Sequence, residues 1–364
     1  HPEVGKNGMV VSQHYLATNV GHSILAEGGN AYDASIAVAF ALAVVLPRAG
    51  NIGGGGFMVM FDEDSQASFS IDYREMAPEA ATKNMFLSSD GSVDNKRATQ
   101  GILSIGVPGT VYGMWEVHKK FGSLPWSKLL APAIELAEDG FLISPFMADA
   151  LNKRYKKLAK FKNFKSIFYS NYPVQMHQRL KQPDLANTLK TISKNGVKGF
   201  YEGEVATKID TYMKESGGLI TKKDLKNYRP IWRETLRGNF NEHEIVTMGP
   251  PSSGGVHIIQ MLNILENYDL TKMGHNSPTY TALLTESMKY AYADRSKYLG
   301  DPEFFNVPVQ SLISKEYAKN IYKKIKLNLI TPSEMILPGS ELEHESMDTT
   351  HFSVADKNGN IVSN

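Results

Sequence analysis

Two adjacent threonines near the end of the sequence could carry nucleophilic chemistry. They follow Asp348 as Thr349 and Thr350, and they open a segment with the alternation of a β-strand. If the Asp348–Thr349 peptide bond is broken, Thr349 gains a free α-amine beside its own hydroxyl. Such an amine has a pKa of roughly 8. It can take the hydroxyl proton and so make the oxygen a nucleophile.

The same hydroxyl could break the bond that precedes it. Attack of the Thr349 oxygen on the Asp348 carbonyl gives an ester that water resolves, with Thr350 orienting the attacking group. The residues alone leave a second interpretation open, because branched side chains are common in strands. Since successive strand residues face opposite ways, one of Thr350 and His351 could simply pack against the protein.

A second candidate, Arg74, follows a predicted β-hairpin. Two apolar segments, 57–61 and 68–71, are joined by a polar turn, which predicts two antiparallel strands. Arg74 then lies just beyond the end of the second strand. Its planar guanidinium could bind a substrate carboxylate through two parallel hydrogen bonds. The alternative is a strand-end ion pair with Asp72 or Glu75.

Short motifs surround these candidates in a fixed order along the chain. They are the segments 28–34, 51–57, 72–78, 106–109, 250–255, 292–295, 300–302 and 348–356. In this order they resemble the motifs of the γ-glutamyltranspeptidases, and the resemblance extends through essentially the whole sequence.

The resemblance implies an α+β fold, the four-layer α/β/β/α sandwich of the N-terminal-nucleophile hydrolases. Members of this family are precursors that cleave themselves before a threonine into a large and a small subunit. Residues 1–348 would be the large-subunit region of one integrated domain, and residues 349–364 the first strands of the small subunit. Because the sequence stops at Asn364, we expect the sandwich and its active site to be incomplete without the rest of the small subunit.

The resemblance also implies the reaction. Thr349 would attack the δ-carbonyl of glutathione or another γ-glutamyl compound and form a γ-glutamyl ester, which water or an acceptor amine resolves. Arg74 matches the family's carboxylate-binding arginine. We predict no metal and no cofactor, and a partnership with the protein's own small subunit. The alternatives are a related acylase, a poly-γ-glutamate transpeptidase, or a non-catalytic truncated remnant.

Composition narrows the classes of partner. The 39 basic and 38 acidic residues give a net charge of +1, so no overall field favours nucleic acid or an anionic membrane. The basic, aromatic-rich segment 153–165 is interpreted as a solvated helix face with its aromatic rings turned inward. The absence of cysteine excludes disulfides and thiolate sites. No His-Glu-x-x-His motif is present, which favours a site without a catalytic metal.

The sequence as given shows no recognisable targeting or membrane-spanning segment. The longest apolar stretch, 34–46, is too short to cross a bilayer and predicts a buried helix. The first residues have no basic start followed by an apolar stretch. As in the family, we expect a signal peptide to have been removed from a periplasmic or secreted bacterial protein.

Several local features complete the expected framework. Gly53–Gly56 predict close backbone packing, since no phosphate-binding motif surrounds them. Ser252 or Ser253 is expected to cap a helix, and Asn30 or Asp33 another. The linker 332–346 is expected to be mobile and exposed. Helices are predicted over 14–27, 34–46, 111–141, 146–213, 256–298 and 315–326, and strands over 9–11, 57–61, 68–71 and 235–248.

Overall fold

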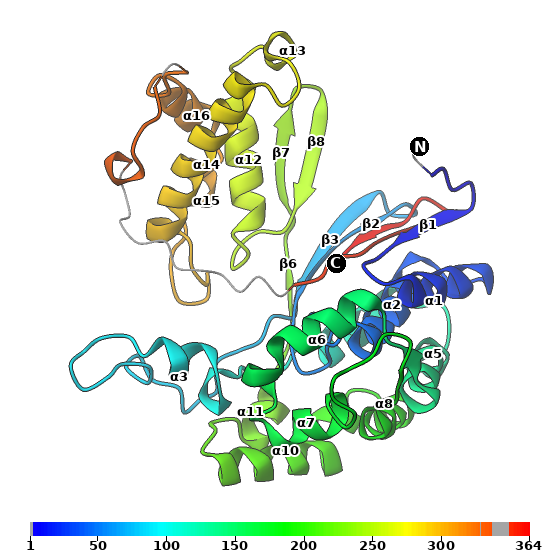
Figure 1. Ribbon diagram of the computed structural model, residues 1–364. Helices are drawn as coiled ribbons and strands as arrows, with labels where there is room; N and C mark the ends of the chain where they lie inside the picture. Colours follow the sequence, from blue (N-terminus) through cyan, green and yellow to red (C-terminus); the bar gives the residue numbers. More distant parts are fainter. Residues whose placement is uncertain (1–2, 328, 337–348) are drawn as a thin grey trace.

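The computed structural model of the protein describes residues 3–327, 329–336 and 349–364. A sheet with helices beneath it forms the larger part, and a smaller part carries a second sheet with its own helices (Figure 1). The alternation of helical and strand segments that the sequence predicts is therefore present.

The main sheet has six antiparallel strands, and its centre is built from the end of the chain. β9 pairs with β1 on one side and with β10 on the other, and β10 pairs with β2. Val354 and Val362 on these two strands are almost completely buried. In order across the sheet the strands are β1 (Gly8–Val11), β9 (Ser353–Asp356), β10 (Ile361–Ser363), β2 (Phe57–Asp62), β3 (Ala67–Asp72) and β6 (Ile231–Arg233).

A buried helix lies against this sheet. α2 (Ala31–Val45) is apolar on every side, and all but one of its 15 residues are buried. It begins at a capping box in which Asn30 accepts from the Asp33 backbone and Asp33 accepts in return. The predicted buried helix over 34–46 is thus confirmed. No helix in the described residues is both long and apolar enough to cross a membrane.

The remaining elements of the larger part are mostly helices. The basic segment 153–165 lies on two of them, and Tyr155 packs against Tyr169 as expected. Phe161 contradicts the expectation, because it is 46% exposed. The elements are α1 (Tyr15–Ala26), α3 (Asn95–Thr99), η1 (Ile102–Ser104), α4 (Thr110–Phe121), α5 (Trp126–Asp139), β4 (Phe141–Leu142), α6 (Pro145–Leu158), α7 (Lys162–Phe168), β5 (Arg179–Leu180), α8 (Pro183–Asn195), α9 (Lys198–Tyr201), α10 (Gly203–Ser216) and α11 (Lys222–Asn227).

The smaller part has two apolar clusters of its own. α12 packs on the hairpin of β7 and β8, and α14 and α16 pack on α12. Figure 1 shows this part above the main sheet, with α12 and α14 beside the hairpin. Its elements are β7 (Leu236–Phe240), β8 (His243–Thr247), α12 (Gly254–Leu265), α13 (Leu270–Met273), α14 (Pro278–Tyr298), α15 (Val309–Leu312) and α16 (Lys315–Tyr322).

The predicted linker departs from expectation at its start. Ser333–Met335 form a short 3-10 helix, η2, and the following Ile336 is only 4% exposed. An apolar side chain therefore anchors this end instead of leaving it free. Residues 337–346 of the predicted linker lie outside the described residues, so their mobility stays a prediction.

Candidate active site

A cleft of about 1070 Å³ brings Thr349 and Arg74 to one site. Its wall includes the end of β3, strand β6, the start of α12 and the last turns of α14. These elements are far apart in the sequence and come from both parts of the molecule. The cleft therefore lies where the main sheet meets the smaller part.

Thr349 is exposed, and the residues after it are held firmly. Phe352 is 2% exposed and exchanges two backbone hydrogen bonds with Asn364, at 2.9 and 3.0 Å. The Thr350 hydroxyl is buried and has no hydrogen-bond partner among the described residues. His351 is exposed, and its Nε2 lies 3.0 Å from the Ser353 hydroxyl. Of Thr350 and His351, it is thus Thr350 that turns inward. Asp348 lies outside the described residues.

Arg74 is exposed, directly beyond β3, as predicted. Its backbone N–H donates to Asp72 Oδ1 at 3.0 Å, and its carbonyl accepts from the Tyr228 hydroxyl at 2.9 Å. Within the described part of the chain, no carboxylate lies within ion-pair distance of the Arg74 guanidinium. The backbone is therefore fixed while the charged group remains available to a ligand.

The alternative ion pair between Arg74 and Asp72 is wrong. Asp72 is buried, and both Nε and Nη2 of Arg233 lie 2.9 Å from its Oδ2. Nη1 of Arg233 also lies 3.4 Å from Glu303 Oε1. Because Arg233 already neutralises Asp72, this carboxylate does not compete for Arg74.

Glycines let the chain pack closely around this arginine. A Cβ at Gly109 would stand 1.9 Å from the Tyr73 carbonyl oxygen, and one at Gly55 would stand 2.4 Å from the same atom. The Gly54 carbonyl accepts from the backbone of Gly109 at 2.7 Å. Larger residues would push the Arg74 backbone out of place. The prediction of close backbone packing by the glycine run is confirmed at Gly54 and Gly55.

Two buried phenols hold the two sides of the site, and sequence reasoning missed both. Tyr228 donates to the Arg74 carbonyl, and Tyr73 donates to Asn364 Oδ1 at 2.5 Å. Burial raises the pKa of both hydroxyls, so they stay protonated and act as donors. Tyr73 thereby links the Arg74 segment to the strand beside the nucleophile segment. Tyr73 adjoins Arg74 in its motif, but no sequence signal pointed to Tyr228.

Ser252 and Ser253 line the cleft, although one of them was expected to cap α12. Ser253 occupies the capping position but makes no side-chain capping bond. Its φ of −78° and ψ of −23° are helical, whereas a capping residue needs a non-helical, typically extended backbone. The expected capping bond of Ser253 is therefore not formed, and Ser253 lines the cleft instead.

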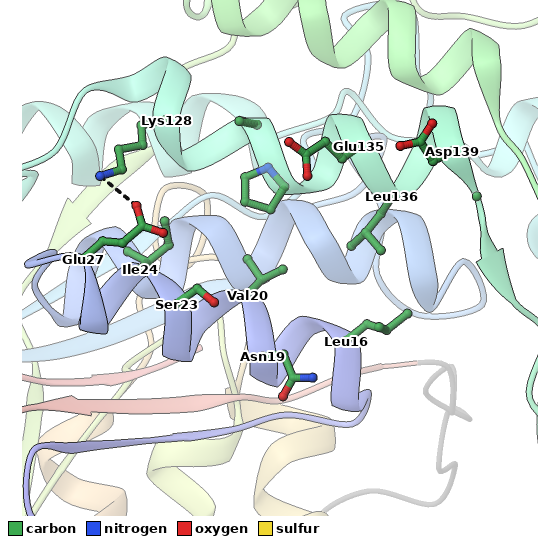
Figure 2. Close-up of a pocket in the computed structure, with 13 residues that line it drawn as sticks. Leu16, Asn19, Val20, Ser23, Ile24, Glu27, Lys128, Glu135, Leu136 and Asp139 are labelled. Atoms are coloured by element: carbon green, nitrogen blue, oxygen red, sulfur yellow. Dashed lines mark ion pairs between the residues drawn. The ribbon is translucent and has the colours of Figure 1, made fainter.

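A second hollow of about 560 Å³ lies between α1 and α5 (Figure 2). Its floor includes Val20 and Leu136, and its charged rim includes Glu27 and Lys128, which pair at 2.8 Å. None of the sequence-predicted site residues lines it. In the described part of the chain, no group of three or more His, Cys, Asp or Glu side chains could hold a metal ion.

Comparison with known proteins identifies the family. The sequence pattern of the family described as Gamma-glutamyltranspeptidase matches residues 17–364. The chain belongs to the γ-glutamyltranspeptidase family. The glutathione hydrolase proenzyme of Escherichia coli K12 is 46% identical over 365 residues, which is 100% of this chain and 63% of that protein. The chain thus spans under two thirds of that relative's length.

Solved structures agree with the family assignment. The γ-glutamyltranspeptidase of Helicobacter pylori superposes with a TM-score of 0.90 at 45% identity, over 95% of this chain and 100% of that chain. The cephalosporin acylase of Bacillus halodurans gives a TM-score of 0.84 at 28% identity, over 100% of this chain and 67% of that chain. The predicted α+β N-terminal-nucleophile hydrolase fold of the γ-glutamyltranspeptidases is therefore confirmed.

Proposed function

We propose that the protein is an autoprocessing γ-glutamyl transferase and hydrolase that acts on glutathione and other γ-glutamyl compounds. The observation that carries this proposal is one cleft with an exposed Thr349 and with Arg74, whose guanidinium has no carboxylate within ion-pair distance among the described residues. A γ-glutamyl group has a carbonyl that Thr349 could attack and an α-carboxylate that Arg74 could bind. Family membership supports the same reading.

The first proposed reaction is self-cleavage at the Asp348–Thr349 bond. The Thr349 oxygen attacks the Asp348 carbonyl, the C–N bond breaks, and the threonine nitrogen keeps the electron pair and becomes an amine. Water then hydrolyses the ester, which leaves the Asp348 carboxylate and a free Thr349 hydroxyl. Residues 1–348 become the large-subunit region, and residues 349–364 begin the small subunit.

Turnover uses the new amine as the base. It takes the hydroxyl proton while the Thr349 oxygen attacks the δ-carbonyl of the substrate, and the proton passes to the leaving amine as the amide C–N bond breaks. Water attacks the resulting ester to give glutamate, or an amino acid attacks it to give a new γ-glutamyl peptide. Arg74 holds the α-carboxylate throughout through two parallel hydrogen bonds.

Further small-subunit residues are proposed to complete the glutamyl pocket and to supply the backbone donors for the oxyanion. We assign the enzyme to the periplasm or the exterior of the cell, with γ-glutamyl small molecules instead of nucleic acid as its partners. The similarity to the cephalosporin acylase favours one rival, a Thr349 acylase for other acyl groups. A protein inert toward γ-glutamyl-4-nitroanilide but active on such acyl groups would establish that rival.

The test is the intact mass of the complete gene product and of its Thr349→Ala variant, followed by turnover of γ-glutamyl-4-nitroanilide. We expect two pieces that meet at Asp348–Thr349 in the parent and one uncut chain in the variant. A single uncut chain in both proteins would leave the non-catalytic remnant as the better description. Cleavage that persists in the variant would remove Thr349 from the mechanism.

A further inference from the structure

The arginines that line the cleft differ in whether they form ion pairs with acidic side chains. Arg233 is neutralised by Asp72 and Glu303. Arg229 lines the same cleft and is exposed, and no carboxylate among the described residues lies within ion-pair distance of it. Arg74 has the same property. Two guanidinium groups without acidic partners in one cleft suit a substrate with two anionic groups.

Contacts with neutral groups hold the Arg229 side chain in place. Its Nη1 donates to the Lys226 carbonyl at 2.8 Å and to the Tyr228 carbonyl at 2.6 Å. Its guanidinium carbon lies 5.2 Å from the centre of the Tyr112 ring. These contacts use one nitrogen and leave Nη2 and Nε without an acceptor in the part of the chain that the structure describes. Because the side chain is already ordered, binding an anion costs it little conformational entropy.

Tyr228 contacts both the Arg229 side chain and the Arg74 backbone. Its carbonyl accepts from the Arg229 guanidinium, while its hydroxyl donates to the Arg74 carbonyl. The two arginines therefore contact opposite ends of one tyrosine. An extended tripeptide spans at most about 10 Å. A γ-glutamyl dipeptide carries one carboxylate near each end, with the scissile amide between them.

We propose that Arg229 binds the carboxylate of the leaving amine, while Arg74 binds the α-carboxylate of the glutamyl group. The inference rests on the proposed function and specifies its substrate class. Donors whose amine is an amino acid or a short peptide, as in glutathione, are preferred over neutral amides. Arg229 contributes binding energy in the acylation step and takes no part in the later attack of water on the ester.

The experiment compares two donors in the complete, processed protein and in its Arg229→Gln variant. One donor is γ-glutamyl-4-nitroanilide, whose leaving group is neutral, and the other is γ-glutamyl-3-carboxy-4-nitroanilide, whose leaving group has a carboxylate. We expect kcat/KM for the carboxylated donor to fall about five- to tenfold, as suits one exposed charged hydrogen bond. The neutral donor should change less than twofold, which also verifies that the variant is folded.

Two further variants control for general electrostatics. Lys226→Gln removes a positive charge three residues away but keeps the backbone carbonyl that holds Arg229, and it should leave the ratio of the two donors unchanged. Arg229→Lys keeps the charge without the planar fork and should recover part of the preference.

An equal loss for both donors in Arg229→Gln, or the same loss in Lys226→Gln, would overturn the assignment while leaving the proposed function standing. If the processed parent protein turned over neither donor, the proposed function would fall, and the role of Arg229 with it.

Discussion

The cleft and the hollow between α1 and α5 use their charged groups in different ways. Between α1 and α5, Lys128 pairs with Glu27 at 2.8 Å above an apolar floor (Figure 2). In the cleft, Arg74 is held by its backbone while no described carboxylate reaches its guanidinium. A cation whose partner is built into the protein stabilises the fold, whereas one that is positioned and left without an anion is suited to a ligand.

If the cleft is the active site, the variant with the largest expected effect is Thr349→Ala in the complete protein. We expect no self-cleavage and a loss of turnover of at least about 10³-fold, because both reactions use the same oxygen. Mass spectrometry and a nitroanilide assay measure the two effects. Thr349→Ser is the matched variant, because it keeps a hydroxyl at the same position and should retain part of both reactions. Turnover in pure, uncut Thr349→Ala protein would refute the assignment of the cleft.

Arg74→Lys should have the next largest effect. A point charge replaces a planar fork, so KM for γ-glutamyl-4-nitroanilide should rise about ten- to a hundredfold with little change in kcat. Steady-state kinetics separates the two constants. An unchanged KM would mean that Arg74, like Lys128 in the hollow between α1 and α5, has no role in substrate binding. Another group would then bind the α-carboxylate.

Tyr228→Phe is expected to weaken substrate binding by Arg74 to a smaller extent. It removes the donor to the Arg74 carbonyl, which should cost about 1 kcal/mol of stability and raise KM about two- to fivefold. Tyr169→Phe is a matched control, because it removes a buried hydroxyl that donates to the Leu151 carbonyl at 2.8 Å. Thermal unfolding should shift similarly in both variants. If KM rose equally in both, Tyr228 would have no specific effect on Arg74.

The smallest effect on stability and kinetics is expected from a substitution in the hollow between α1 and α5. Lys128→Gln breaks a pair whose side chains are 40% and 50% exposed, so the free energy of unfolding should fall by less than about 1 kcal/mol. Both kinetic constants should stay at the parent values. A change in turnover would show that the hollow communicates with the cleft.

Local sequence signals predicted the framework well. The hairpin that ends before Arg74 was evident because two strand-like apolar segments joined by a polar turn are a short-range pattern. The Asn30 cap and the buried helix after it were equally local. Phe161 and Ile336 were assigned the wrong exposure, because burial depends on neighbours that a short sequence pattern does not contain.

Local sequence signals could not predict which charged side chains of the cleft form ion pairs. Whether Arg74 is paired depends on Arg233, which lies 161 residues from the Asp72 that it neutralises. Tyr228, which donates a hydrogen bond to the Arg74 carbonyl, lies 154 residues from Arg74 in the sequence. Arg229 sits in no motif that sequence reasoning singled out. Such contacts arise only when distant strands come together, so the sequence indicated which residues could react but not which of them would be free to do so.

The position of β9 and β10 at the centre of the main sheet has a consequence for the two pieces of a cleaved chain. β9 is paired with β1, and β10 with β2, so a cut before Thr349 would sever the chain without breaking any of these ladders. Separating the pieces would require the central strands to leave the sheet. The two pieces would then be held together by the same strand pairing and burial that stabilise the fold, so we expect them to stay associated without a covalent link.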